Sequence, residues 1–152
     1  MMTSSFEDIK SQLRLSCIQG NFEKVQEILG ILQKRNFDAN IIIDEELEKT
    51  ALIYCAEYGY LQICNYLLQN GAQCDAKDKG KWTPLHYAAK EGHFDVCAVL
   101  LQNGASVSEM NEANLTPLHI ATNEDHSEIC NLLIENGAAA GTFEVKKSKK
   151  LM

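Results

Sequence analysis

Thr83-Pro84-Leu85-His86 is repeated 33 residues later as Thr116-Pro117-Leu118-His119. The same spacing separates three Gly-Ala pairs that end successive units, namely Gly71-Ala72, Gly104-Ala105 and Gly137-Ala138. A fixed period of this length is typical of repeat architectures, in which each unit buries its apolar face only against its neighbours. The chain is therefore predicted to form a stack of similar units.

The third unit predicts two helices joined by a tight turn. Thr83 to Glu91 should form the first helix, because Pro84 is well tolerated at the first helical position. Gly92 allows a left-handed turn, and Phe94 to Asn103 should form the second helix. That second segment carries an apolar stripe at helical spacing, made of Val96, Cys97, Val99 and Leu100.

The other units follow this pattern less closely. The fourth runs from Thr116 to Ala138 and has Asp125 in place of the turn glycine. The second begins at Thr50 and lacks the Pro and the His. The first is the most degenerate, with polar residues in the Thr, Pro and His positions: Ser11, Gln12 and Arg14. The link between the first two units is six residues longer than the others, which should lengthen a helix and the connection through residues 33–43.

These motifs resemble the ankyrin-repeat family over residues 8 to 142. The resemblance implies an all-α repeat fold, an ankyrin solenoid of stacked helix-turn-helix units with β-turn or hairpin fingers around residues 71–81 and 104–114. It places an ankyrin-repeat domain at 1–142 and a lysine-rich C-terminal tail at 143–152. The expected units are about 8–40, 47–76, 80–109 and 113–141.

Charge is distributed unevenly along the chain. The formal net charge is −7, and the segment from Glu91 to Val145 holds nine acidic residues and no Lys or Arg. Such a segment repels nucleic-acid phosphates and attracts a basic partner, so nucleic-acid binding is not expected. The lysines that follow, at 146, 147, 149 and 150, are expected to lie loosely against the acidic face and to compete with such a partner.

Hydrophobicity gives no sign of a membrane protein. No apolar stretch approaches the roughly 20 residues needed to span a bilayer, and the N-terminus lacks the features of a secretory signal. We therefore expect a cytoplasmic location, with the nucleus as an open alternative, and a monomer that does not bind membranes.

Six cysteines are expected to be reduced and buried. Three of them, Cys64, Cys97 and Cys130, share one repeat position, so neighbouring repeats separate them by about 8–10 Å. That distance exceeds the roughly 7 Å limit for a disulfide between Cα atoms. No C-x-x-C motif occurs, so a metal site is not expected either.

Catalytic chemistry is not indicated. In the ankyrin resemblance, His86 and His119 tie adjacent repeats together by hydrogen bonds. His93, Asp95 and Cys97 lie close in sequence, but residues two apart on a helix do not face each other. No phosphate-binding loop, nucleophile elbow or zinc-protease motif is present. The sequence therefore predicts a protein that is not an enzyme and has no cofactor.

Positions that differ between repeats are the candidates for partner binding. Trp82, the only tryptophan, is predicted to be exposed beside Leu and Met as an interface hot spot. The alternative is that its ring lies flat on its own finger. The full set of candidates is Trp82, Leu115, Met110, Lys77, Lys79, Lys90, Glu91, Glu112, Asn123, Glu124, Glu46, Lys49 and Tyr58.

The predicted function is a non-catalytic protein–protein interaction module or scaffold. The resemblance implies a peptide or folded partner on the concave face formed by the fingers and first helices. One alternative is an acidic reader of Lys/Arg-rich tails such as histone segments, held by Glu112, Glu124 and Trp82. A second is that the chain is an ankyrin fragment of a larger multidomain protein.

Overall fold

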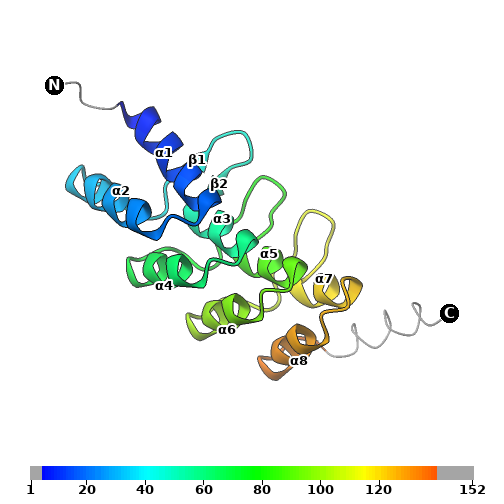
Figure 1. Ribbon diagram of the computed structural model, residues 1–152. Coiled ribbons are helices and arrows are strands. Elements are labelled where there is room, and N and C mark those ends of the chain that lie inside the picture. Colours follow the sequence, from blue (N-terminus) through cyan, green and yellow to red (C-terminus); the bar gives the residue numbers. More distant parts are fainter. Residues whose placement is uncertain (1–4, 140–152) are drawn as a thin grey trace.

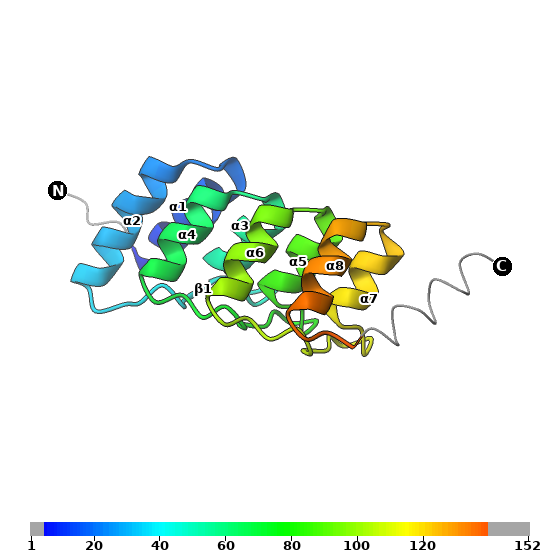
Figure 2. The same cartoon turned by 90° about the horizontal axis from the view of Figure 1, so that it is seen from below.

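Four helix pairs stack side by side in residues 5–139, the part of the chain that the computed structural model describes (Figure 1). The inner helices are α1 (Phe6–Gln19), α3 (Ala51–Tyr58), α5 (Pro84–Glu91) and α7 (Pro117–Asn123). The outer helices are α2 (Phe22–Lys34), α4 (Leu61–Gln69), α6 (Phe94–Gln102) and α8 (Ser127–Glu135), and Figure 2 shows them in one row. The predicted all-α repeat solenoid is confirmed, and no described helix is long and apolar enough to cross a membrane.

The Thr-Pro-Leu-His motif starts the inner helices by reciprocal capping. The Thr83 hydroxyl accepts from the His86 backbone N–H at 3.3 Å, and His86 Nδ1 accepts from the Thr83 N–H at 3.1 Å. Thr116 and His119 repeat both bonds. Each pair provides hydrogen-bond acceptors for backbone N–H groups that otherwise have no partner at the start of a helix. His86 also reaches the next repeat, because its Nε2 donates to the Leu115 carbonyl at 2.9 Å.

A second set of hydrogen bonds joins each of the first three inner helices to the following repeat. The bonds run from Tyr60 to the Ile18 carbonyl (2.8 Å), from His93 to that of Glu57 (2.9 Å) and from His126 to that of Lys90 (3.0 Å). Each carbonyl lies in the last turn of an inner helix, where no helical donor is left to bind it.

The turn glycines leave room for these rings. A Cβ on Gly59 would lie 2.6 Å from the His93 ring, and a Cβ on Gly92 would lie 2.7 Å from the His126 ring. Asp125 takes the turn position in the fourth unit at φ 61°, and the described residues contain no further unit whose ring needs the space.

The first unit differs most from the others. The alignment of Ser11 with the motif threonine does not mark a helix start, because α1 begins at Phe6 and is capped by Ser5 and Asp8. The predicted lengthening of the second helix is confirmed, since α2 has 13 residues where α4, α6 and α8 have nine. The long connection then forms a hairpin of β1 (Ile42–Asp44) and β2 (Lys49–Thr50).

The cysteines are all free thiols, and five of the six are buried, as predicted. The prediction is wrong for Cys74, which is only half-buried, with its Sγ 3.4 Å from the Asn103 carbonyl. Its position falls in the loop after α4 and not on a helix face, so neighbouring repeats cover only part of it.

We expect a thiol reagent to modify only Cys74 in the native protein and all six cysteines in denaturant. Partial burial raises the pKa of Cys74 above 9.0, with Asp75 adding to the effect, so its reaction should be slower than that of free cysteine. Absorbance titration and mass spectrometry would count the labelled thiols. In a Cys74→Ser variant, rapid native labelling should disappear; if it persists, another thiol is accessible.

Stability should fall as the pH drops below about 6.5, the ordinary pKa of histidine. Burial lowers the pKa of His86 in the folded state, so the unfolded chain binds the proton more readily and acid favours unfolding. Its Nδ1 already accepts the Thr83 N–H, and protonation would break that bond. Urea unfolding at pH 7.5 and 5.5 would measure the loss. A His86→Gln variant, which retains a capping side chain, should show a flatter pH dependence; an identical slope would contradict the assignment.

Candidate functional site: the finger surface

Three fingers project between the helix pairs and lie along the inner helices (Figure 1). They comprise residues 44–49, 77–82 and 109–115. Their backbones are joined, because the Lys79 N–H donates to the Leu47 carbonyl at 3.0 Å and the Glu112 N–H donates to the Gly80 carbonyl at 2.9 Å. We call these fingers, with Tyr58, Lys90, Glu91, Asn123 and Glu124 at the ends of the inner helices, the finger surface.

Buried polar side chains hold the first two fingers against the inner helices. Asp78 accepts the backbone N–H groups of Gly80 and Trp82 at 3.0 and 2.9 Å, and it also accepts the Tyr87 hydroxyl. Asp44 accepts the Leu47 N–H and the Tyr54 hydroxyl in the same way. Burial and the neighbouring carboxylate raise the pKa of both tyrosines, so both remain hydrogen-bond donors.

The third finger has the same anchor without the tyrosine. Asn111 Oδ1 accepts the N–H groups of Ala113 and Leu115, each at 3.0 Å. Ile120 occupies the repeat position of Tyr54 and Tyr87 and offers no polar atom. The buried Asn111 Nδ2 consequently has no partner among the described residues, and this finger is less firmly attached than the other two.

Lys49 was predicted to contact a partner, but the structure encloses its side chain. Its ammonium lies 2.9 Å from Glu57 and over the rings of Tyr54 and Tyr87, at 5.0 and 4.5 Å. Only 9% of the side chain is exposed. Because Tyr87 belongs to the next unit, Lys49 joins two repeats and we remove it from the contact surface.

Trp82 is half-buried and is therefore less exposed than predicted. One side of the ring meets Tyr87 at a centroid distance of 4.9 Å, and Lys90 Nζ lies 5.6 Å from its centre. A Cβ on Gly80 would come within 3.2 Å of the indole, so the ring lies close to its own finger. The ring therefore lies close to the alternative arrangement, and part of the Trp82 side chain remains exposed.

Leu47 and Met110 are the large apolar side chains that the fingers expose, at 45% and 51%. Leu47 was not among the predicted contacts. It could have been recognised, because it is the single apolar residue in the acidic segment Asp44–Glu48. Tyr58 is 44% exposed, and Leu115 is half-buried. Exposed apolar groups therefore lie on the first and third fingers and at the end of α3.

The charge of the fingers alternates along the stack. The first carries Glu45, Glu46 and Glu48, the second Lys77, Lys79 and Lys81, and the third Glu109 and Glu112. Within residues 5–139, Glu45 pairs with Lys10 and Lys77 pairs with Glu109 at 2.6 Å. Glu46, Lys79 and Glu112 are exposed and have no ion pair in that range, and Lys90, Glu91, Asn123 and Glu124 are exposed beside them.

Among the described residues, the one possible catalytic arrangement noted in the sequence is not formed. His93, Asp95 and Cys97 diverge, since Cys97 is fully buried and His93 binds the Glu57 carbonyl. In the described part of the chain, no group of three or more His, Cys, Asp or Glu is placed to hold a metal ion. The expected contact of the C-terminal lysines with the acidic face lies outside the described residues.

The chain matches a protein-family model. A model described as "Ankyrin repeats (3 copies)" matches residues 13–111 and again residues 77–144. The two matched spans overlap and include all three fingers and every helix after α1.

Each finger contains a residue other than glycine in the left-handed region, at the same repeat position. The residues are Glu48, Lys81 and Asn114, with φ of 56°, 63° and 60°. Asn tolerates this conformation, whereas a longer side chain is disfavoured by about 1–2 kcal/mol.

We expect Lys81→Gly to stabilise the protein by about 0.5–1 kcal/mol, because relief of the left-handed strain exceeds the added entropy of the unfolded chain. Chemical denaturation would measure the change. Lys79→Gly is the matched control, because Lys79 is an exposed lysine of the same finger without a positive φ, and it should not stabilise. Equal effects of the two substitutions would show that the finger is not strained at Lys81.

Proposed function

The chain belongs to the ankyrin-repeat family, and we propose that its finger surface binds a segment of another protein without catalysing a reaction. Ankyrin repeats are in general protein–protein interaction modules. The observation that carries the proposal is the contrast between framework and surface. Thr83 and His86 are buried, and the same residue types recur at the equivalent positions of the next unit. The exposed finger residues instead differ from unit to unit.

The finger surface favours a partner of mixed charge. Neighbouring repeats lie about 10 Å apart, so a bound segment would meet Glu46, then Lys79, then Glu112 at roughly that interval. It would present a basic, an acidic and a basic group in that order. Leu47 and Met110 would supply apolar contacts at the two ends.

The remaining candidates lie around this line of contacts. Tyr58, Lys90, Glu91, Asn123 and Glu124 border the fingers from the inner helices, and Lys77, Trp82 and Leu115 lie within the fingers. An acidic reader of basic tails fits this surface less well, because the middle finger is basic. A uniformly basic segment would meet Lys79 and Lys81 at its centre, which like charges disfavour.

Affinity capture from a cell lysate tests the proposal with matched variants. We expect Leu47→Ser combined with Met110→Ser to reduce recovery of specifically bound proteins about ten-fold or more, since hot-spot truncations commonly remove over 1 kcal/mol each. Both side chains are about half exposed, so the variant should stay folded, which a denaturation curve would verify.

Ile31→Ser is the control, because Ile31 is an exposed apolar residue on α2, away from the fingers. It should recover the same proteins as the wild-type chain. Undiminished recovery by the finger variant, or an equal loss with Ile31→Ser, would contradict a binding role for the finger surface.

A further inference from the structure

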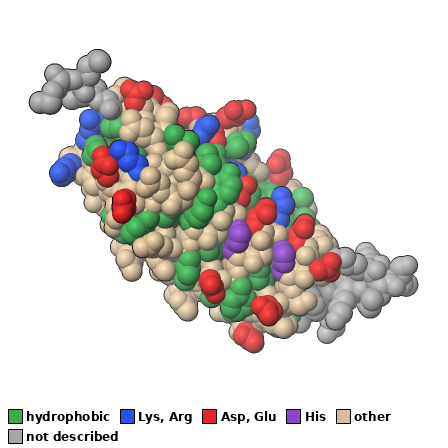
Figure 3. All heavy atoms as spheres, viewed as in Figure 1, with side chains coloured by type: hydrophobic (Ala, Val, Ile, Leu, Met, Phe, Trp, Pro, Cys, Tyr) green, Lys and Arg blue, Asp and Glu red, His purple; other side chains and the backbone are tan. Residues whose placement is uncertain are grey.

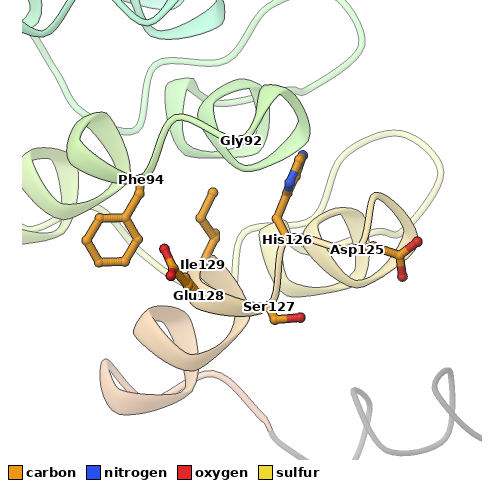
Figure 4. A pocket seen from close by; sticks show the side chains of 7 residues that line it. All are labelled: Gly92, Phe94, Asp125, His126, Ser127, Glu128 and Ile129. Atoms are coloured by element: carbon orange, nitrogen blue, oxygen red, sulfur yellow. The ribbon is translucent and has the colours of Figure 1, made fainter.

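Two equivalent hollows lie on the outer side of the stack, at the turns that lead into α6 and α8. One of about 330 Å³ is lined by Leu61, Phe94 and Asp95, and the other, of about 340 Å³, by Phe94, Glu128 and Ile129. Their lining residues are related by the 33-residue period, so Asp95 and Glu128 hold the same place in each. Figure 4 shows the second hollow, with Phe94 of α6 beside Glu128 and Ile129 of α8.

Phe94 is the apolar centre of this region. It lines both hollows and is 39% exposed, although it begins a helix whose other face is buried. A third hollow of about 390 Å³ continues from Phe94 along α8 past Leu132 to Glu135. Phe94 lines all three hollows, which together form one depression with carboxylates at its edges. We call Phe94, Asp95, Glu128, Leu132 and Glu135 the outer patch.

The carboxylates of the outer patch are not balanced by positive charge. Asp95, Glu128 and Glu135 are exposed, and none forms an ion pair within residues 5–139. The sequence has no Lys or Arg from 91 to 145. Figure 3 shows acidic side chains over the end of the stack that carries α6 and α8, without basic ones among them.

Helix stability explains only part of this charge. Asp95 and Glu128 lie in the first turns of α6 and α8, where a carboxylate is favourable to the helix dipole. Glu135 is the last residue of α8, where a negative charge is unfavourable, and the last turn of α8 contains no basic residue.

We propose that the outer patch binds a cationic segment of a partner protein. Two Lys or Arg side chains about 10 Å apart would reach Asp95 and Glu128, since that is the spacing of neighbouring repeats. A segment in the polyproline II conformation has three residues per turn and a rise of about 3.1 Å per residue, so its positions one and four face the same side about 9 Å apart. The segment therefore has basic residues at positions one and four, with an apolar side chain between them on Phe94. Charge complementarity selects this partner, and the surface is separate from the fingers.

A fluorescein-labelled peptide, Gly-Lys-Leu-Ala-Lys-Gly, tests the proposal by anisotropy with the full chain at low salt. We expect it to bind, and a version with Glu in place of both Lys to fail. Asp95→Asn combined with Glu128→Gln should raise the Kd about five-fold, as expected for the loss of two exposed ion pairs. Phe94→Ala should also weaken binding, and about 0.5 M salt should abolish it.

Three controls decide the interpretation. Glu23→Gln, an exposed carboxylate in the same repeat position of the first unit, should leave the Kd unchanged.

An undetectable interaction, or a Kd unaffected by Asp95→Asn with Glu128→Gln, would overturn the proposal. So would a comparable loss with Leu47→Ser and Met110→Ser, since the peptide would then lie on the fingers. A several-fold gain on replacing Lys146, Lys147, Lys149 and Lys150 by Gln would show that the chain's own lysines fill the patch, which also overturns partner binding.

Discussion

One hydrogen bond, repeated between neighbouring units, sets the geometry on which the rest of the structure depends. A ring of each unit after the first donates to a carbonyl in the last turn of the preceding inner helix, as His93 does to Glu57. The bond needs a glycine beside that carbonyl, because a side chain on Gly59 would collide with the ring. Together they fix the distance and the rotation between inner helices. The fingers follow from this spacing, since each meets its neighbour through a single backbone bond.

Much of the framework could be predicted from the sequence, because it depends on contacts that recur at a fixed interval. Thr83-Pro84-Leu85-His86 marks a helix start through local capping, and Gly92 marks a turn. What escaped prediction depends on contacts between units or on signals that were present but not used. Lys49 is enclosed because Tyr87 comes from the next repeat. The early start of α1 is visible as Ser5 followed by Asp8, a capping box that alignment to the repeat obscured.

The candidate binding residues show the same division. Their positions on the fingers were predictable from the register, but their exposure was not, since it depends on how each side chain packs. Trp82 is covered on one side by Tyr87, whereas Met110 on the next finger is 51% exposed. The distribution of charge was also only partly predictable. The sequence shows that the C-terminal half is acidic in total, but not where its charges lie in space. In the structure, the fingers alternate in sign, whereas the outer patch around Phe94 is acidic throughout.

Asp125 has a consequence for how such an array can be lengthened. A copy of the third unit inserted before the fourth would bring its own histidine and its own turn glycine. Every pair of neighbouring units would then retain the hydrogen bond between ring and carbonyl, and a glycine that leaves room for the ring. A copy joined after the fourth unit would place its ring against the Cβ of Asp125. The interior of the array therefore accepts insertion of modules, whereas growth beyond the fourth unit first requires that a single aspartate be exchanged for glycine.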